Sequence, residues 1–166
     1  MGIHIYANQG SAGIDQSNGN GYYIVWPKDP FASAARLRTA LMKTYKLKKL
    51  GIVITDSTSR PLRRGASGFA LAWAGFNPVY DYRGTPDIFG RPIKVEQANI
   101  VDGLAAAAVL CMGEAGEQTP LALLRDVPKV VWDAKPAKKD DEFVVPLERD
   151  LYAPFFKNAP WRKGKR

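Results

Sequence analysis

Apolar positions at helical spacing predict two helices. In the first, apolar residues recur on one face from Phe31 to Tyr45. Asp29 and Pro30 come directly before this face, and such a pair is typical of a helix N-terminus. The second helix is expected over residues 102–112, because an alanine-rich stretch there keeps its apolar residues on one face and ends at a glycine.

Short apolar or alternating runs predict strands around these helices. Residues 51–55 and 69–73 are almost continuously apolar, which is typical of buried strands, whereas residues 92–98 alternate apolar with charged side chains. Three shorter strands are expected at residues 3–6, 22–26 and 121–124, the last of them buried. The chain contains no internal repeat.

Polar segments rich in glycine or proline connect the expected elements. Residues 7–21 include many residues that tolerate positive φ, which indicates a tight reversal or close approach to a ligand. Glycines and prolines across residues 75–91 predict a loop without regular structure, ordered by its aromatic side chains. With 166 residues, 46% of them hydrophobic, the chain suits one domain, which we place at residues 1–156 before a basic tail at residues 157–166.

The net charge of +8 raises the possibility of a nucleic-acid partner, because lysine and arginine clusters bind phosphate backbones. Much of the excess lies in residues 43–49, at the end of the first helix, and in residues 162–166. Cations near a helix C-terminus and a solvated tail explain both runs, and aromatic residues do not interleave with them as a stacking platform requires. We therefore expect no nucleic-acid partner.

No stretch of about 18 apolar residues is present, and the start of the chain lacks a basic region followed by an apolar core. We therefore expect a cytoplasmic protein without a membrane partner. Cys111 is the only cysteine and His4 the only histidine, so an internal disulfide and a thiolate-rich metal site are excluded. We expect Cys111 to be a small buried residue of the second helix, and nothing near His4 suggests a catalytic pair.

Two aspartates stand where an expected strand or loop meets the next element. Asp56 follows the strand at residues 51–55 and leads into two serines, a threonine and Arg60. A carboxylate followed by hydroxyl groups and a guanidinium group suits a metal-bound phosphate, since Mg²⁺ takes hard oxygen ligands. The alternative for Asp56 is a turn cap. Asp102 opens the second helix, where the alternative is helix capping.

The arginines of the central segment exceed what a loop needs for solubility; they are Arg60, Arg63, Arg64, Arg83 and Arg91. We expect Arg60 first, and Arg83 next, to bind phosphate, and others to pair with Asp81 and Asp87. Neither a phosphate-binding loop of the Gly-x-x-x-x-Gly-Lys-Ser/Thr type nor a Gly-x-Gly-x-x-Gly dinucleotide fingerprint is present.

Several motifs in register resemble the gamma-glutamyl ligases that add glutamate to the deazaflavin coenzyme F-420 precursor. They are Ser11-Ala-Gly-Ile-Asp-Gln-Ser-Asn18, Ile54-Thr-Asp-Ser57, Asp81-Tyr-Arg-Gly84, Asp87-Ile-Phe-Gly-Arg91, Val101-Asp102 and Met112-Gly-Glu114. Two later motifs, Asp126-Val-Pro128 and Asp150-Leu-Tyr-Ala-Pro154, look more like a bacterial branch described as folate-metabolism gamma-glutamate ligases.

This resemblance implies an α+β fold, with a mixed sheet and packed helices, that forms an intertwined homodimer. It also implies a reaction that depends on GTP and on Mg²⁺ or Mn²⁺. GTP would phosphorylate the acceptor carboxylate, and the amine of L-glutamate would displace phosphate to form an amide. Carried over by position, Asp56 and Asp102 would bind the metal and Ser59 would lie against the nucleotide, while Asp15 and Asn18 would shape the same cleft.

Two departures from the family pattern keep an alternative open. Gly103 stands where the family usually has a glutamate that binds a second metal, and family members carry a longer segment before the Ser11 motif. The chain could therefore be a fragment, or a non-catalytic relative that binds a phosphate ligand or a partner chain. The identity of the acceptor, the number of glutamates added and the choice between GTP and ATP stay open.

Overall fold

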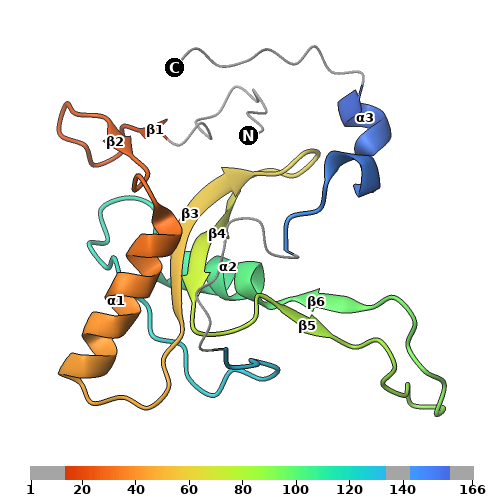
Figure 1. Ribbon diagram of the computed structural model, residues 1–166. Helices are drawn as coiled ribbons and strands as arrows, with labels where there is room; N and C mark the ends of the chain where they lie inside the picture. Colours follow the sequence, from red (N-terminus) through yellow and green to blue (C-terminus); the bar gives the residue numbers. More distant parts are fainter. Residues whose placement is uncertain (1–13, 134–142, 158–166) are drawn as a thin grey trace.

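The fold is organised around an antiparallel hairpin of two long strands, β3 (Ile52–Ser59) and β4 (Ala66–Ala74) (Figure 1). The computed structural model of the chain describes residues 14–133 and 143–157. A register shift between Ile54 and Thr55 marks a β-bulge, where β4 carries an extra residue.

Helix α1 (Pro30–Thr44) covers one face of the hairpin. Its N-cap is Asp29, whose side chain accepts a hydrogen bond from the backbone N–H of Ala32 at 2.9 Å, as expected from the sequence. Ala34 is fully buried against two alanines of β4, and these small side chains let the helix approach the sheet closely.

Helix α2 (Ile100–Met112) covers the opposite face, where Val101 and Ala105 are fully buried against Ala70 and Trp73. Gly68 marks the closest approach: a Cβ atom there would lie 2.6 Å from the carbonyl oxygen of Ala105. The position therefore requires glycine because any side chain would push helix and strand apart.

Two smaller hairpins and a C-terminal segment surround this centre. Strands β1 (Ile14–Asp15) and β2 (Ile24–Val25) pair before α1, while β5 (Val79–Asp81) and β6 (Gln97–Asn99) form the base of an arm that projects from the centre (Figure 1). A short 3-10 helix (Leu147–Arg149) and α3 (Ala153–Lys157) follow. The α+β class is confirmed, but the described strands form three separate two-stranded antiparallel sheets rather than one mixed sheet.

The central strands extend further than the sequence indicates. The strand expected at residues 51–55 continues to Ser59, and the one expected at 69–73 spans Ala66–Ala74. Polar residues continue β3 because its backbone stays paired with β4 up to the turn. In contrast, the strand expected at residues 22–26 is reduced to Ile24–Val25.

Four other expectations are wrong. The segment 75–91 contains a strand, β5, while the strand expected at residues 92–98 is limited to Gln97–Asn99. Residues 121–124 form no strand, and Leu121 is 85% exposed, because no described strand pairs with them. Cys111 is exposed, since the buried face of α2 is set by Val101, Ala105, Ala108 and Val109.

Some expectations fall outside the described residues: the strand at 3–6 with His4, residues 7–13 of the glycine-rich loop, and residues 158–166 of the basic tail. Lys157 itself ends α3. None of the helices in the described part of the chain is long and apolar enough to span a membrane.

Candidate functional site

Asp56 lies within β3, directly opposite Phe69 of β4, and not after the end of the strand as the sequence suggested. The indole N–H of Trp26 donates a hydrogen bond to its Oδ2, and the backbone N–H of Ser57 donates to its Oδ1 at 2.8 Å. The Trp26 ring also meets the Phe69 ring edge to face, with centroids 6.3 Å apart. Asp56 therefore shares one face of the hairpin with Phe69, and an aromatic residue fixes its orientation.

Asp102 lies in the first turn of α2, but it does not cap the helix. Asn99 does so, because its side chain accepts from the backbone N–H of Asp102 at 3.1 Å. The Asp102 carboxylate accepts from the backbone N–H of Ala70 at 2.9 Å and from Nδ2 of Asn99 at 2.7 Å. The side chain thus joins the start of α2 to β4, and its charge favours the helix dipole.

The two carboxylates meet consecutive residues of one strand: Asp56 stands opposite Phe69, and Asp102 accepts a hydrogen bond from Ala70. Asp56 and Asp102, 46 residues apart in the sequence, therefore lie at neighbouring positions along the length of β4. Each carboxylate has two hydrogen bonds and about four acceptor positions, so each can also bind a cation. Within residues 14–133 and 143–157, no group of three or more histidine, cysteine, aspartate or glutamate side chains could hold a metal ion.

Asp15 ends β1, and Asn18 lies in the turn that leads to β2. The backbone N–H of Ser17 donates to the Asp15 carboxylate at 2.9 Å and lowers its pKa below the usual value for aspartate. Asn18 donates from Nδ2 to the carbonyl oxygen of Ala115 at 2.8 Å, which ties this turn to the segment after α2. The same hairpin leads into Trp26, so it lies next to Asp56, whereas a shared cleft stays a prediction.

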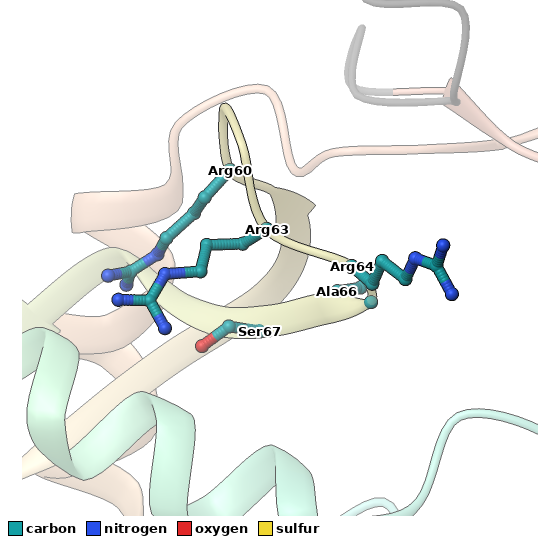
Figure 2. A pocket seen from close by; sticks show the side chains of 6 residues that line it. Arg60, Arg63, Arg64, Ala66 and Ser67 are labelled. Carbon is teal, nitrogen blue, oxygen red and sulfur yellow. The ribbon is translucent and has the colours of Figure 1, made fainter.

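The β3–β4 turn encloses an open pocket of about 300 Å³. Its lining residues are Arg60, Arg63, Arg64, Gly65, Ala66 and Ser67 (Figure 2). Ser59 is the last residue of β3, and the backbone N–H of Arg63 donates to the carbonyl oxygen of Arg60 at 3.3 Å to close the turn. The structure thus brings Ser59 and Arg60 together at the end of the strand that carries Asp56.

Arg83 lies elsewhere, in the arm that β5 and β6 begin. Its guanidinium group forms two parallel hydrogen bonds with Asp81, as expected for some arginines of this segment. This pairing lowers the pKa of Asp81 to about 2. The structure therefore does not place Arg83 beside Arg60, and a phosphate-binding role for it stays a prediction.

Sequence reasoning missed three residues of this region. Trp26 carried no signal beyond an expected strand, because an indole contact with Asp56 depends on the tertiary fold. Ser67 lies between Gly65 and Gly68, directly before the strand expected at residues 69–73, and its residue type carries no functional signal there. Asn99 could have been identified from the sequence, because it lies just before the expected second helix and asparagine is a common N-cap. Its side chain accepts from the backbone N–H of Asp102, three residues later.

The sequence matches one protein family and several curated relatives. A family model described as F420-0:Gamma-glutamyl ligase matches residues 4–126. The coenzyme F420:L-glutamate ligase of Methanococcus maripaludis is 37% identical over 118 residues, which cover 71% of this chain and 47% of that relative. The enzyme of the same name from Methanopyrus kandleri is 36% identical over 143 residues, or 86% of this chain and 56% of the relative. The corresponding protein of Halobacterium salinarum is 40% identical over 117 residues, or 70% and 44%.

The chain spans about half the length of the curated relatives it matches. The matched region includes Asp15, Asp56, Asp102 and the arginine-rich turn. Because the family model matches most of this chain, the chain belongs to the F420-0:gamma-glutamyl ligase family.

Proposed function

We propose that the protein acts as a GTP-dependent gamma-glutamyl ligase that joins L-glutamate to a deazaflavin or folate-like acceptor, as a homodimer. The family match and the names of the relatives support this activity. In the first step the acceptor carboxylate takes the γ-phosphoryl group of GTP, which gives an acyl phosphate and GDP. The glutamate amine then attacks the acyl carbon, phosphate leaves, the nitrogen loses a proton and an amide is formed.

The observation that carries the proposal is that Asp56 stands opposite Phe69 and Asp102 accepts a hydrogen bond from Ala70, so both carboxylates belong to consecutive positions along β4, Asp56 on the face of Phe69 and Asp102 from α2 on the other face. We assign both carboxylates as ligands of Mg²⁺ or Mn²⁺. Two carboxylates suit this role, because Mg²⁺ commonly binds one or two of them together with water and substrate phosphates. The bound metal would neutralise charge on the nucleotide phosphates. The Trp26 indole would keep Asp56 oriented while one of its oxygens turns to the cation.

The remaining assignments follow the same geometry. Ser59 and Arg60 would contact the nucleotide phosphates from the end of β3, where a guanidinium fork can pair with phosphate oxygens. Asp15 and Asn18 would shape the cleft from the β1–β2 hairpin, which Trp26 links to Asp56. Arg83 would reach phosphate only after leaving Asp81.

Thermal unfolding with GTP and Mn²⁺ tests the nucleotide and metal dependence. Ligand at about 100 times its dissociation constant stabilises a folded protein by about 2.7 kcal/mol, or roughly 5–11 °C for a chain of this size. Asp56→Asn should abolish the Mn²⁺-dependent part of this shift and leave the unfolding of the free protein cooperative. Asp126→Asn is the matched control, because Asp126 is exposed and its positive φ of 54° suits asparagine.

A full shift in Asp56→Asn would exclude Asp56 as a ligand, and no shift of the wild type with GTP or ATP would count against the ligase. The catalytic step is tested by mass spectrometry of the acceptor after incubation with GTP, Mn²⁺ and L-glutamate. Addition of one glutamyl residue is expected.

The alternative, a non-catalytic relative that binds a phosphate ligand or a partner chain, is favoured by one observation. Gly103 offers no carboxylate where the family pattern has one, although no atom would crowd a side chain there. Nucleotide-dependent stabilisation without any glutamylated product would support this alternative.

A further inference from the structure

The β3–β4 turn directs two guanidinium groups to one pocket, and no carboxylate is among the residues that line it. Arg60 and Arg63 both extend to the side of the turn where the Ser67 hydroxyl lies, and Arg64 points the other way (Figure 2). In the described part of the chain, no hydrogen bond or ion pair joins the side chain of Arg60 or Arg63 to another residue. Two cations in one pocket repel each other, so their common orientation favours an anion in that pocket.

Ser67 connects this pocket to the face that carries Asp56. In the paired register Ser67 stands opposite Thr58, two residues from Phe69, and alternate residues of a strand share a face. Gly68, between them, faces α2 on the other side. Ser67 therefore lies on the same face as Asp56, and three residues of β3, or about 10 Å of strand, separate Asp56 from the turn. The two arginines occupy this end of the face.

We propose that Arg60, Arg63 and Ser67 form a subsite for a phosphate group of the nucleotide, with Arg63 and Ser67 as binding residues in addition to Arg60. The inference rests on the proposed function and names the contacts of the same site. Two planar forks and a hydroxyl group supply donors from three directions, which suits the tetrahedral oxygens of a phosphate better than the two oxygens of a planar carboxylate. Two positive charges also match the charge of a terminal phosphate, about −1.5 to −2 at neutral pH.

The other lining residues keep the pocket open. Gly65 has φ of +87°, a conformation that residues with a side chain rarely adopt, and no atom lies within 4 Å of a Cβ built there. The Ser67 hydroxyl has only a long contact, 3.4 Å, with the carbonyl oxygen of Gly68. It can therefore turn to a ligand without breaking a strong hydrogen bond.

The test uses binding of tripolyphosphate, GTP, guanosine, inorganic phosphate and L-glutamate to the full chain, in EDTA so that no divalent metal contributes. Isothermal titration calorimetry compares the wild type with Arg63→Gln and Ser67→Ala. Arg64→Gln is the matched control, because it removes the same charge from the same turn on the side away from Ser67. We expect Arg63→Gln to weaken tripolyphosphate and GTP binding at least tenfold and Ser67→Ala to weaken it severalfold, with Arg64→Gln within twofold of the wild type.

Several results would overturn the inference. Equal losses in Arg63→Gln and Arg64→Gln would indicate a diffuse basic surface. Loss of L-glutamate binding with unchanged tripolyphosphate binding would identify a carboxylate site instead. No binding of tripolyphosphate to the wild type would exclude the subsite. Inorganic phosphate that binds as tightly as GTP would show that a free phosphate, and not the nucleotide, is the ligand.

This experiment is separate from the test of the proposed function. Binding that depends on Arg63 but brings no glutamylated product would retain the subsite and refute the ligase. A glutamylated product with no effect of Arg63→Gln on GTP binding would retain the ligase and refute the subsite.

Discussion

Asp102→Asn separates the structural role of this residue from its proposed role as a metal ligand. Its carboxylate joins α2 to β4 through Ala70 and is also bound by Asn99. Hydrogen bonds to charged groups contribute about 1.5–3 kcal/mol and neutral ones about 0.5–1.5, so neutralising the acceptor for Ala70 costs about 1 kcal/mol. Losing a negative charge in the first helical turn adds about 0.5 kcal/mol. The NH₂ group of the new asparagine would also face one of the two donors, the Ala70 N–H or Asn99 Nδ2, and so replace a hydrogen bond by a contact between two donors. We therefore expect the free energy of unfolding to fall by about 2 kcal/mol in total.

Urea unfolding followed by circular dichroism measures this loss in the absence of nucleotide and metal. Asp126→Asn should change the free energy of unfolding by less than about 0.5 kcal/mol, as expected for an exposed position. If Asp102→Asn is no more destabilising than this control, the link between α2 and β4 does not contribute as the hydrogen bonds indicate. Repeating both titrations with GTP and Mn²⁺ isolates the ligand effect. An unchanged increase in stability in Asp102→Asn would refute Asp102 as a metal ligand.

Three further predictions address other parts of the fold. Gly68→Ala should lower stability by about 1–3 kcal/mol, because its Cβ would meet the Ala105 carbonyl oxygen at 2.6 Å; an unchanged melting temperature would contradict this packing. Arg83→Gln should raise the pKa of Asp81 from about 2 toward the ordinary aspartate value, which an NMR titration measures. In the wild type, the ionised Asp81 contributes stability that is present above about pH 4 and is lost as the pH falls toward 2; in the variant this contribution should be absent. Phe89→Ser, at a 78% exposed position in the arm, should weaken the proposed homodimer in light scattering without lowering monomer stability.

The helices were predictable because their ends carry local signals. Asp29 and Pro30 mark the start of α1, and Gly113 marks the end of α2. The strand limits were not predictable in the same way, because β3 continues through Asp56 to Ser59 with polar side chains. Pairing with β4 satisfies the backbone of those residues, and a sequence pattern does not contain the partner strand.

The chemistry of the site was visible in residue types, but its geometry depends on tertiary contacts. Asp56 and Asp102 were each identified at a junction of elements, yet only the packing of α2 along β4 brings them to neighbouring residues of that strand. The same limit applies to the arginines of residues 60–64, because the sequence favours Arg60 but does not show which way each side chain points. The turn directs Arg60 and Arg63 to the Ser67 side and Arg64 away from it (Figure 2), so one charge can be removed on either side of the same turn. That asymmetry is what makes a phosphate subsite distinguishable from a generally basic surface.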